Sequence, residues 1–365
     1  MTTKIPSELV SDQVFGRRNL FINGKMQVAQ RGTSGTLASG YETVDRWETV
    51  MSSAGTWTVS QSTTVPSGEG FAHSQKLNCE TADASLDASN FLLWRQKIEG
   101  INLQHLKYGT SSAEKLTLSF WVRSAKTGTY IVELNNENSG GAKKQSQSYT
   151  ISSANTWEKK TITYAGDTAT AFENTTDGEL LVYFWLAAGS TYAGGGSLNT
   201  SWNSGVATNT RAVGQVNLAD STSNDWYITG VQLEVGDNAT PFEHLSYGEE
   251  FTNCSRYFQV IGFQEDAFGA YSVSTTRGFV SLPMLPMRGN PTGALSDLET
   301  RYFSSANDNS WNSTSGTVFI LGNTSFQYNA SAVVIPTIAI TVDYAGDRTD
   351  VFGLIRGKLT LDAEL

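Results

Sequence analysis

The feature that most constrains this chain is an alternation of apolar and polar side chains, with a period of two residues, that recurs along much of its length. It is clearest at Leu116–Ser124 (LTLSFWVRS) and at Thr129–Leu134 (TYIVEL). Such a period places apolar side chains on one face of a β-strand and polar side chains on the other. Further strands are expected at residues 157–164, 180–187, 226–235, 278–283, 317–321 and 332–344.

Few segments show the spacing of a helix. Residues 247–259 (YGEEFTNCSRYFQ) place Phe251, Cys254 and Phe258 at helical intervals, whereas residues 9–14 are short and ambiguous. The spacers between the expected strands carry turn residues, as in Gly194–Gly196. Short strands that follow one another without helices are typical of an antiparallel β-sandwich. We therefore expect an all-β protein.

Composition shifts along the chain predict its domain organisation. A polar leader ends near residue 19, and a second boundary falls near residues 243–258, beyond which the pattern is again β. The chain thus divides into an attachment segment, a sandwich, a short connecting helix and a smaller C-terminal β domain that is distal or trimerising. Their predicted bounds are 1–18, 19–246, 247–258 and 259–365.

Charge and cysteine usage exclude several classes of protein. The 365 residues carry a net charge of −10, and only 16% are charged, which disfavours binding to nucleic acid or to an anionic membrane. No run approaches the roughly 20 apolar residues of a membrane helix. Three His and two Cys exclude a rich zinc or iron–sulfur cluster. Cys79 and Cys254 are expected to be free and buried, with one disulfide as the alternative.

No catalytic constellation is visible. The chain lacks a G-x-S-x-G elbow and a Cys–His pattern, and no pair of its 35 acidic residues is marked out as the two carboxylates of a glycosidase. We expect no catalytic residues and no metal-ligating histidines. A structural Ca²⁺ is the one cofactor considered, and solvated surface acids are the preferred interpretation of its candidate donors. These donors are Asp83, Asp87, Asp225 and Glu234.

Aromatic residues divide into two groups. Trp121, Phe184 and Trp185 lie in predicted strands and are expected in the core, and Trp47 is expected to close the sandwich edge. A planar ring on a polar loop can stack on a sugar, whereas Asn and Ser bind hydroxyls. Alternatively, each ring pins its own loop or fills a trimer interface. The candidate glycan-binding residues on Gly-, Asn- and Ser-rich stretches are Tyr192, Trp202 and Trp311.

The hydrophilic leader cannot bury enough apolar surface to be ordered alone. A docking peptide for an acidic, grooved partner is the preferred interpretation, and a frayed terminus is the alternative. The residues expected to attach the chain to its partner are Ile5, Leu9, Val10, Val14, Phe15, Arg17 and Arg18.

Several short blocks, in a fixed order, resemble virion structural proteins of tailed bacteriophages of the tail-fibre and tail-spike type. The first is residues 19–32 (NLFINGKMQVAQRG) followed by residues 43–47 (TVDRW), and the second is residues 225–237 (DWYITGVQLEVGD). Smaller matches lie at residues 240–257, 286–288 (PMR) and 362–365 (DAEL), so the blocks bracket nearly the whole chain.

The resemblance implies a jelly-roll sandwich like a carbohydrate-binding module and a homotrimeric virion appendage made in the host cytoplasm. Its partners would be further copies of itself, other tail or capsid proteins bound through the N-terminus, and a host-surface glycan. A head fibre, capsid decoration or fibre adaptor without receptor binding is the alternative, and a polysaccharide depolymerase is the least favoured. Neither nucleic acid nor membrane insertion is expected.

Overall fold

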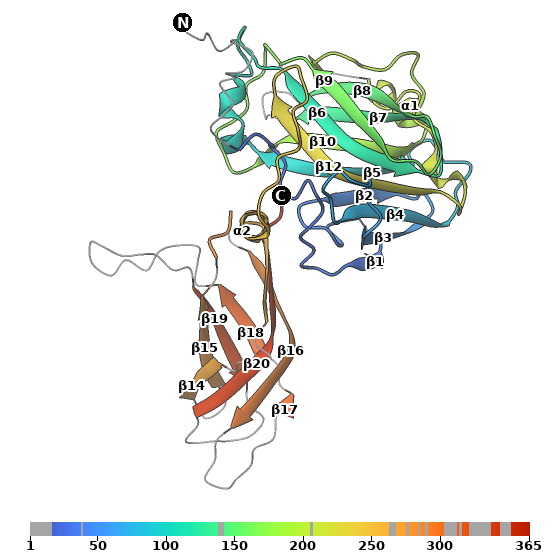
Figure 1. Cartoon of the computed structure of the whole chain (residues 1–365). Helices are drawn as coiled ribbons and strands as arrows, with labels where there is room; N and C mark the ends of the chain where they lie inside the picture. The colour runs from blue at the N-terminus through green and yellow to red at the C-terminus, as the bar shows by residue number, and fades with distance from the viewer. Residues whose placement is uncertain are drawn as a thin grey trace, which may run out of the picture. The chain divides into compact units, whose positions relative to one another are not determined.

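The computed structural model describes most of the chain. The described residues are 17–37, 39–137, 142–204, 207–262, 268–274, 277–283, 285–288, 291–302, 312–313, 316–320, 337–343 and 352–365. They divide into two compact units, residues 1–250 and 251–365 (Figure 1). The division falls within the segment for which a connecting helix was expected.

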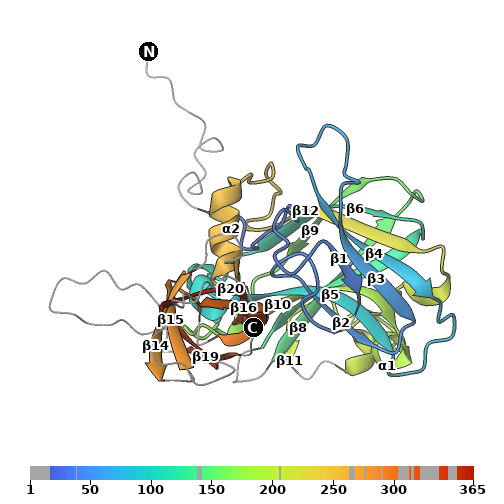
Figure 2. The same cartoon turned by 90° about the horizontal axis from the view of Figure 1, so that it is seen from below.

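The first unit is a sandwich of two six-stranded antiparallel sheets. The first sheet has the order β1-β3-β4-β12-β6-β9, and β1, β3 and β4 lie side by side in Figure 2. Its strands are β1 (Ser34–Thr36), β3 (Thr56–Ser62), β4 (Ser74–Thr81), β12 (Asp225–Val235), β6 (Leu116–Ser124) and β9 (Glu158–Tyr164).

The second sheet has the order β11-β8-β7-β10-β5-β2. Successive strands cross repeatedly between the two sheets, which is the connectivity of a jelly roll. Its strands are β11 (Asn203–Ser204), β8 (Lys143–Ile151), β7 (Gly128–Asn136), β10 (Gly178–Ala188), β5 (Phe91–Glu99) and β2 (Glu48–Ser52).

The core lies between the two sheets and is rich in aromatic rings. Trp94 and Phe184 from the second sheet meet Trp226 from the first, with ring centroids 5.5–6.2 Å apart. Trp47 stacks on Trp94 and closes the core beside β2, as expected from the sequence. Burial of these large apolar surfaces is the main driving force for the fold.

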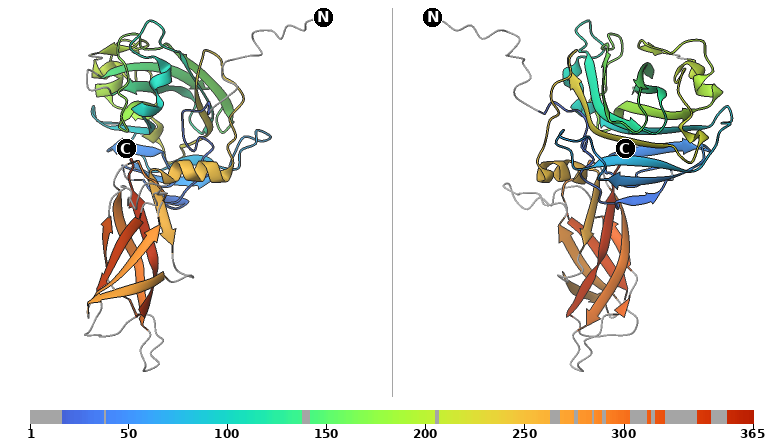
Figure 3. Two further views of the ribbon diagram at one scale, coloured as in Figure 1. Left: turned by 90° about the vertical axis from the view of Figure 1, so that its left-hand side faces the viewer. Right: turned by 45° about the vertical axis from the view of Figure 1, so that its right-hand side comes forward.

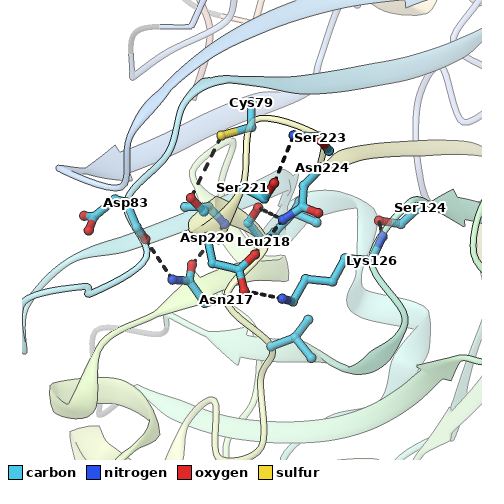
Figure 4. A network of polar contacts seen from close by, with 12 residues as sticks. Cys79, Asp83, Ser124, Lys126, Asn217, Leu218, Asp220, Ser221, Ser223 and Asn224 are labelled. Atoms are coloured by element: carbon cyan, nitrogen blue, oxygen red, sulfur yellow. Dashed lines mark hydrogen bonds and ion pairs between the residues drawn. The ribbon is translucent and has the colours of Figure 1, made fainter.

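A network of polar contacts ties the loop before β12 to the sandwich (Figure 4). The Lys126 ammonium forms an ion pair with Asp220, which also accepts a hydrogen bond of 2.7 Å from the Asn224 amide. The Asn217 amide donates to the carbonyl of Asp83 at 2.9 Å. Cys79 lies at the edge of this network and, like Cys254, is a buried cysteine that forms no disulfide, as predicted.

Helix α2 (Tyr247–Ser255) begins with a capping box. The backbone N–H of Ser246 donates to the Glu249 carboxylate at 2.9 Å, and the Glu249 N–H donates back to the Ser246 hydroxyl. The helix is shorter than the predicted range 247–259, because strand β13 (Phe258–Gly262) starts within that range.

The second unit is an eight-stranded antiparallel sheet whose strands lie alongside one another in Figure 3. Strand β20 is paired with β14 and β16, and β13 also pairs with it. Besides β13, the strands are β14 (Phe268–Ser274), β15 (Arg277–Pro283), β16 (Thr292–Tyr302), β17 (Asn312–Ser313), β18 (Gly316–Ile320), β19 (Thr337–Asp343) and β20 (Phe352–Asp362). The predicted all-β, antiparallel class is thus confirmed.

Candidate functional site

The predicted sugar-stacking residues are not brought together. Tyr192 lies in the short helix α1 (Ser190–Ala193), where its half-buried ring is 5.2 Å from Phe91 and 5.3 Å from Trp185. Trp202 lies beside Tyr108 instead, with ring centroids 5.8 Å apart. Trp311 lies outside the described residues. Tyr192 therefore remains a candidate on its own.

Trp202 anchors its loop to other parts of the sandwich. Its indole N–H donates to the carbonyl of Ala165 at 2.5 Å, and its ring packs partly buried against the core. The Gln145 amide donates to the carbonyl of Thr200, two residues earlier, at 2.9 Å. These contacts favour the alternative interpretation, in which the ring pins the loop to the edge of the second sheet.

The two arginines of the predicted attachment segment contact the sandwich itself. The Arg18 guanidinium donates to the Thr240 hydroxyl at 2.8 Å, and its backbone N–H donates to the Glu243 carboxylate at 3.0 Å. The Arg17 guanidinium donates to the carbonyl of Phe21 at 3.2 Å. The remaining attachment candidates, residues 5–15, lie outside the described residues.

The acids considered for Ca²⁺ do not form a metal site. Glu234 is buried and accepts hydrogen bonds from Gln232 and from Thr240, whereas Asp225 faces Arg123. Within the described part of the chain, no group of three or more His, Cys, Asp or Glu side chains could hold a metal ion.

Of the three side chains assigned to the core from their strands, only Phe184 lies between the two sheets. Phe184 lies in the main core, and Trp185 is buried in a separate cluster. Trp121 is not in the core, and that prediction was wrong. Because Phe120 and Val122 point inward, the alternation of β6 forces the side chain between them outward.

The separate cluster covers the outer face of the second sheet, which is the face turned away from the core. Here Trp185 and Tyr183 of β10 pack beside Leu93 of β5 and Ile131 of β7, with Ala212 lying over them. Aromatic and polar side chains are therefore concentrated on a sheet face outside the main core. This face is the candidate functional site.

A row of polar side chains crosses this face beside the cluster. The strand register aligns Glu48 of β2 with Arg95 of β5, then Tyr183 of β10, then Glu133 of β7. Arg211 reaches the row from the loop after α1. We call these five residues the second-sheet row.

Two Arg–Glu pairs hold the second-sheet row. The Arg95 guanidinium donates to both oxygens of Glu48, at 2.7 and 3.0 Å. The Arg211 guanidinium likewise donates to both oxygens of Glu133, at 2.6 and 2.9 Å. Bidentate pairs of this kind fix planar groups in place. They also neutralise both carboxylates.

Tyr183 lies between the two pairs. The guanidinium carbons of Arg95 and Arg211 lie 5.5 and 5.8 Å from the centre of its ring. Its hydroxyl oxygen accepts long hydrogen bonds of 3.4 Å from Arg95 and from the Asn135 amide. Burial raises the pKa of this hydroxyl, which therefore keeps its proton at neutral pH.

Burial and ion pairing shift the pKa values of the charged side chains in and beside the second-sheet row in opposite directions. Burial raises the pKa of the Glu133 carboxyl, whereas hydrogen bonds from Arg211 oppose that rise. Burial also lowers the pKa of Lys97, which lies 3.6 Å from Glu48 at the edge of the row. With its charges paired, the row suits an uncharged ligand that has many hydroxyls more than a strongly charged one.

Sequence reasoning missed the second-sheet row, although one signal was present. Arg95, Glu133 and Tyr183 occupy alternate, outward positions of strands whose inward positions are mostly apolar. A charged side chain at an outward position of a buried strand is expected to pair with an opposite charge on the neighbouring strand. The identity of that partner depended on the strand order.

Comparison with known proteins gives only distant likenesses. No family model matches the sequence, and no curated protein matches it. Among solved structures, the enzymatically active domain of bacteriophage CBA120 tailspike protein 4 is 14% identical, with a TM-score of 0.33 over 60% of this chain. The chain spans 21% of that tailspike chain.

Carbohydrate-binding modules are at a similar distance. TmCBM61, solved with β-1,4-galactotriose, is 12% identical with a TM-score of 0.30, and the match covers 60% of this chain and all of that one. The C-terminal family 22 module of Clostridium thermocellum Xyn10B is 14% identical with a TM-score of 0.30, covering 54% of this chain and 91% of that one. At these scores the likenesses assign no ligand to this chain.

Proposed function

We propose that this protein is a non-catalytic, glycan-binding structural component of a phage tail appendage, and that the second-sheet row forms part of its binding site. The observation that carries the proposal is the position of Tyr183 between two bidentate Arg–Glu pairs. Fixed planar donors beside aromatic rings are the groups that recognise a sugar, whose face is apolar and whose rim carries hydroxyls.

The chemistry of the row supports binding more than hydrolysis. A glycosidase needs a carboxylic acid that is free to give up a proton and a second carboxylate that is free to attack or to activate water. Both oxygens of Glu48 and of Glu133 are occupied by arginine instead. Such paired carboxylates can orient hydroxyls but are poor proton donors.

The phage assignment has its support in the sequence. The ordered blocks at residues 19–47 and 225–257 resemble tailed-phage virion proteins. A homotrimer attached through the leader, with a glycan of the host surface as ligand, is the assembly that this resemblance favours. Mass photometry of the full chain at micromolar concentration tests it, and a monomer would contradict the trimeric part.

The glycan site is tested with the full chain on an array of neutral bacterial surface polysaccharides. Tyr183→Phe removes the hydroxyl and retains the ring, and it should weaken binding by about three- to tenfold, the net contribution of one hydrogen bond. Tyr192→Ala should weaken it further, because it removes the half-buried ring beside Trp185. Trp121→Ala, on the opposite sheet, is the matched control and should leave binding to neutral glycans unchanged. Equal binding by the wild type and both tyrosine variants would overturn the site.

A further inference from the structure

The outer face of the first sheet carries a second aromatic group, which the proposed function does not use. Trp121 of β6 lies directly opposite Thr229 of β12 and Lys159 of β9. Tyr227 lies opposite Arg123 in the same way, two residues along each strand. We define the first-sheet platform as Lys76, Trp121, Arg123, Trp157, Lys159 and Tyr227.

Trp121 presents an indole ring among small neighbours. Its cross-strand and same-strand neighbours on this face include Ser119, Thr161 and Thr229, which are too short to cover a ring. The side chain is half-buried, and within the described part of the chain it makes no contact with another aromatic ring. A half-buried tryptophan on the outer face of a sheet provides a flat surface for a ligand.

Cations surround the aromatic rings of the platform. The Arg123 guanidinium carbon lies 4.7 Å and the Lys76 ammonium 5.4 Å from the centre of the Tyr227 ring. Lys159 is exposed beside Trp121. The acid that meets this group is Asp225, whose carboxylate oxygen is 3.8 Å from Arg123. In a chain with a net charge of −10, this local excess of cations is unusual.

Neighbouring acids at the rim are occupied by other groups. Glu158 accepts a hydrogen bond of 2.5 Å from Lys160 and further bonds from backbone N–H groups. Glu80 accepts hydrogen bonds from Thr58 and from Asn78, at 2.7 and 2.9 Å. The platform therefore differs from the second-sheet row, where each arginine has its own bidentate carboxylate.

Two donors within the platform make no hydrogen bond, although Nη1 of Arg123 lies 3.8 Å from the Asp225 carboxylate. The Nη1 group of Arg123 and the indole N–H of Trp157 are both buried and make no hydrogen bond. Trp157 packs against Tyr227, with ring centroids 6.2 Å apart, so the two donors belong to one cluster. Buried donors usually find a partner. What this cluster lacks is a group rich in acceptors.

We infer that the first-sheet platform binds an acidic glycan, with a carboxylated sugar stacked on Trp121 and its carboxylate facing Lys159 and Arg123. A polymer with a carboxylate on every sugar or on every second sugar matches a few cations spread between aromatic rings. Nucleic acid fits less well, because its closely spaced phosphates require a longer row of cations than this acidic chain offers.

The inference is tested by calorimetry on the full chain with polygalacturonate, alginate, hyaluronate and polysialic acid, and with dextran as the neutral counterpart. At least one acidic polymer should bind, and Trp121→Ala and Lys159→Glu should each weaken that binding about tenfold or more. Raising NaCl from about 50 to about 500 mM should weaken it as well, because the exposed charges become screened. Lys159→Glu changes an exposed side chain, so it keeps the test valid should Trp121→Ala fold poorly.

The controls separate this site from the second-sheet row. Lys115→Glu makes the same charge change at a side chain that is 58% exposed and pairs with Asp237, away from the platform. It should leave binding unchanged, as should Tyr183→Phe. No binding to any acidic polymer at millimolar sugar concentration, an equal loss in Lys115→Glu, or equal competition by duplex DNA would each overturn the inference without bearing on the neutral-glycan site.

Discussion

The indole rings of Trp47 and Trp94 are stacked, with centroids 3.8 Å apart and planes 6° from parallel. Trp47 also donates its indole N–H to the carbonyl of Asn23 at 3.2 Å, which ties the entry segment of the sandwich to its core. The stack thus joins the segment before β2 to strand β5 of the second sheet.

Replacing Trp47 by alanine should destabilise the first unit by about 3–5 kcal/mol, because a large cavity forms and a hydrogen-bond acceptor is left buried. Urea unfolding followed by tryptophan fluorescence measures this, since eight of the nine tryptophans precede residue 251. Trp121→Ala, at a half-buried outer position, should cost only about 1 kcal/mol. Similar losses in the two variants would contradict the assignment of Trp121 to the outer face.

Arg211→Met should destabilise the first unit by about 3–5 kcal/mol at neutral pH, because the Glu133 carboxylate is left buried without its cation. Burial already raises the pKa of Glu133, and loss of Arg211 removes the largest of the interactions that oppose that rise. A raised folded-state pKa contributes stability that is present at low pH and lost as pH rises. The difference in urea midpoint between variant and wild type should therefore grow from pH 5 to pH 8. A constant difference would argue against a buried charge.

The ion pair between Lys126 and Asp220 makes the loop before β12 sensitive to acid. Burial opposes ionisation of Asp220, but hydrogen bonds from Lys126 and Asn224 outweigh it and lower the pKa of the carboxyl below its ordinary 3.8. A lowered pKa contributes stability that is present above pH 3.8 and lost as pH falls through the folded-state value.

Asp220→Asn should therefore lower the melting temperature at pH 7 and change it little near pH 2, as measured by calorimetry. Lys115→Ala removes one member of an exposed pair that stands apart from this network, and it is the control. A loss that is equal at both pH values would show that the Asp220 side chain acts through packing rather than charge.

Gly230 lies where the pairing of β12 with β6 shifts register, between Thr229 and Gln232. Its φ is +61°, and a Cβ atom built there would lie 2.5 Å from the Phe71 ring. Gly230→Ala should cost about 1–3 kcal/mol through backbone strain and displacement of that ring. Gly196→Ala, where nothing lies within 4 Å of the added atom, should change stability by less than about 0.5 kcal/mol. Urea midpoints of the two variants check this, and equal effects would contradict it.

The sequence by itself determined the class of fold and several strand boundaries. Residues 116–124 form β6 over the whole predicted range, since the inward positions 116, 118, 120 and 122 are apolar and the buried backbone can satisfy its hydrogen bonds only by pairing. The same parity indicated that Trp121 points outward, but its hydrophobicity suggested the core. The position in the alternation determines the face on which Trp121 lies, because a side chain on a strand cannot reach the opposite face of the sheet.

Tertiary structure alone decided which outward side chains meet. The second-sheet row is assembled from four strands that are distant in sequence and from one loop. The strands contribute Glu48, Arg95, Glu133 and Tyr183, and the loop contributes Arg211. Alternation fixes the face on which each residue lies but not its neighbour across the sheet. Strand order and register fix that neighbour, and they follow from the packing of the whole core between the two sheets.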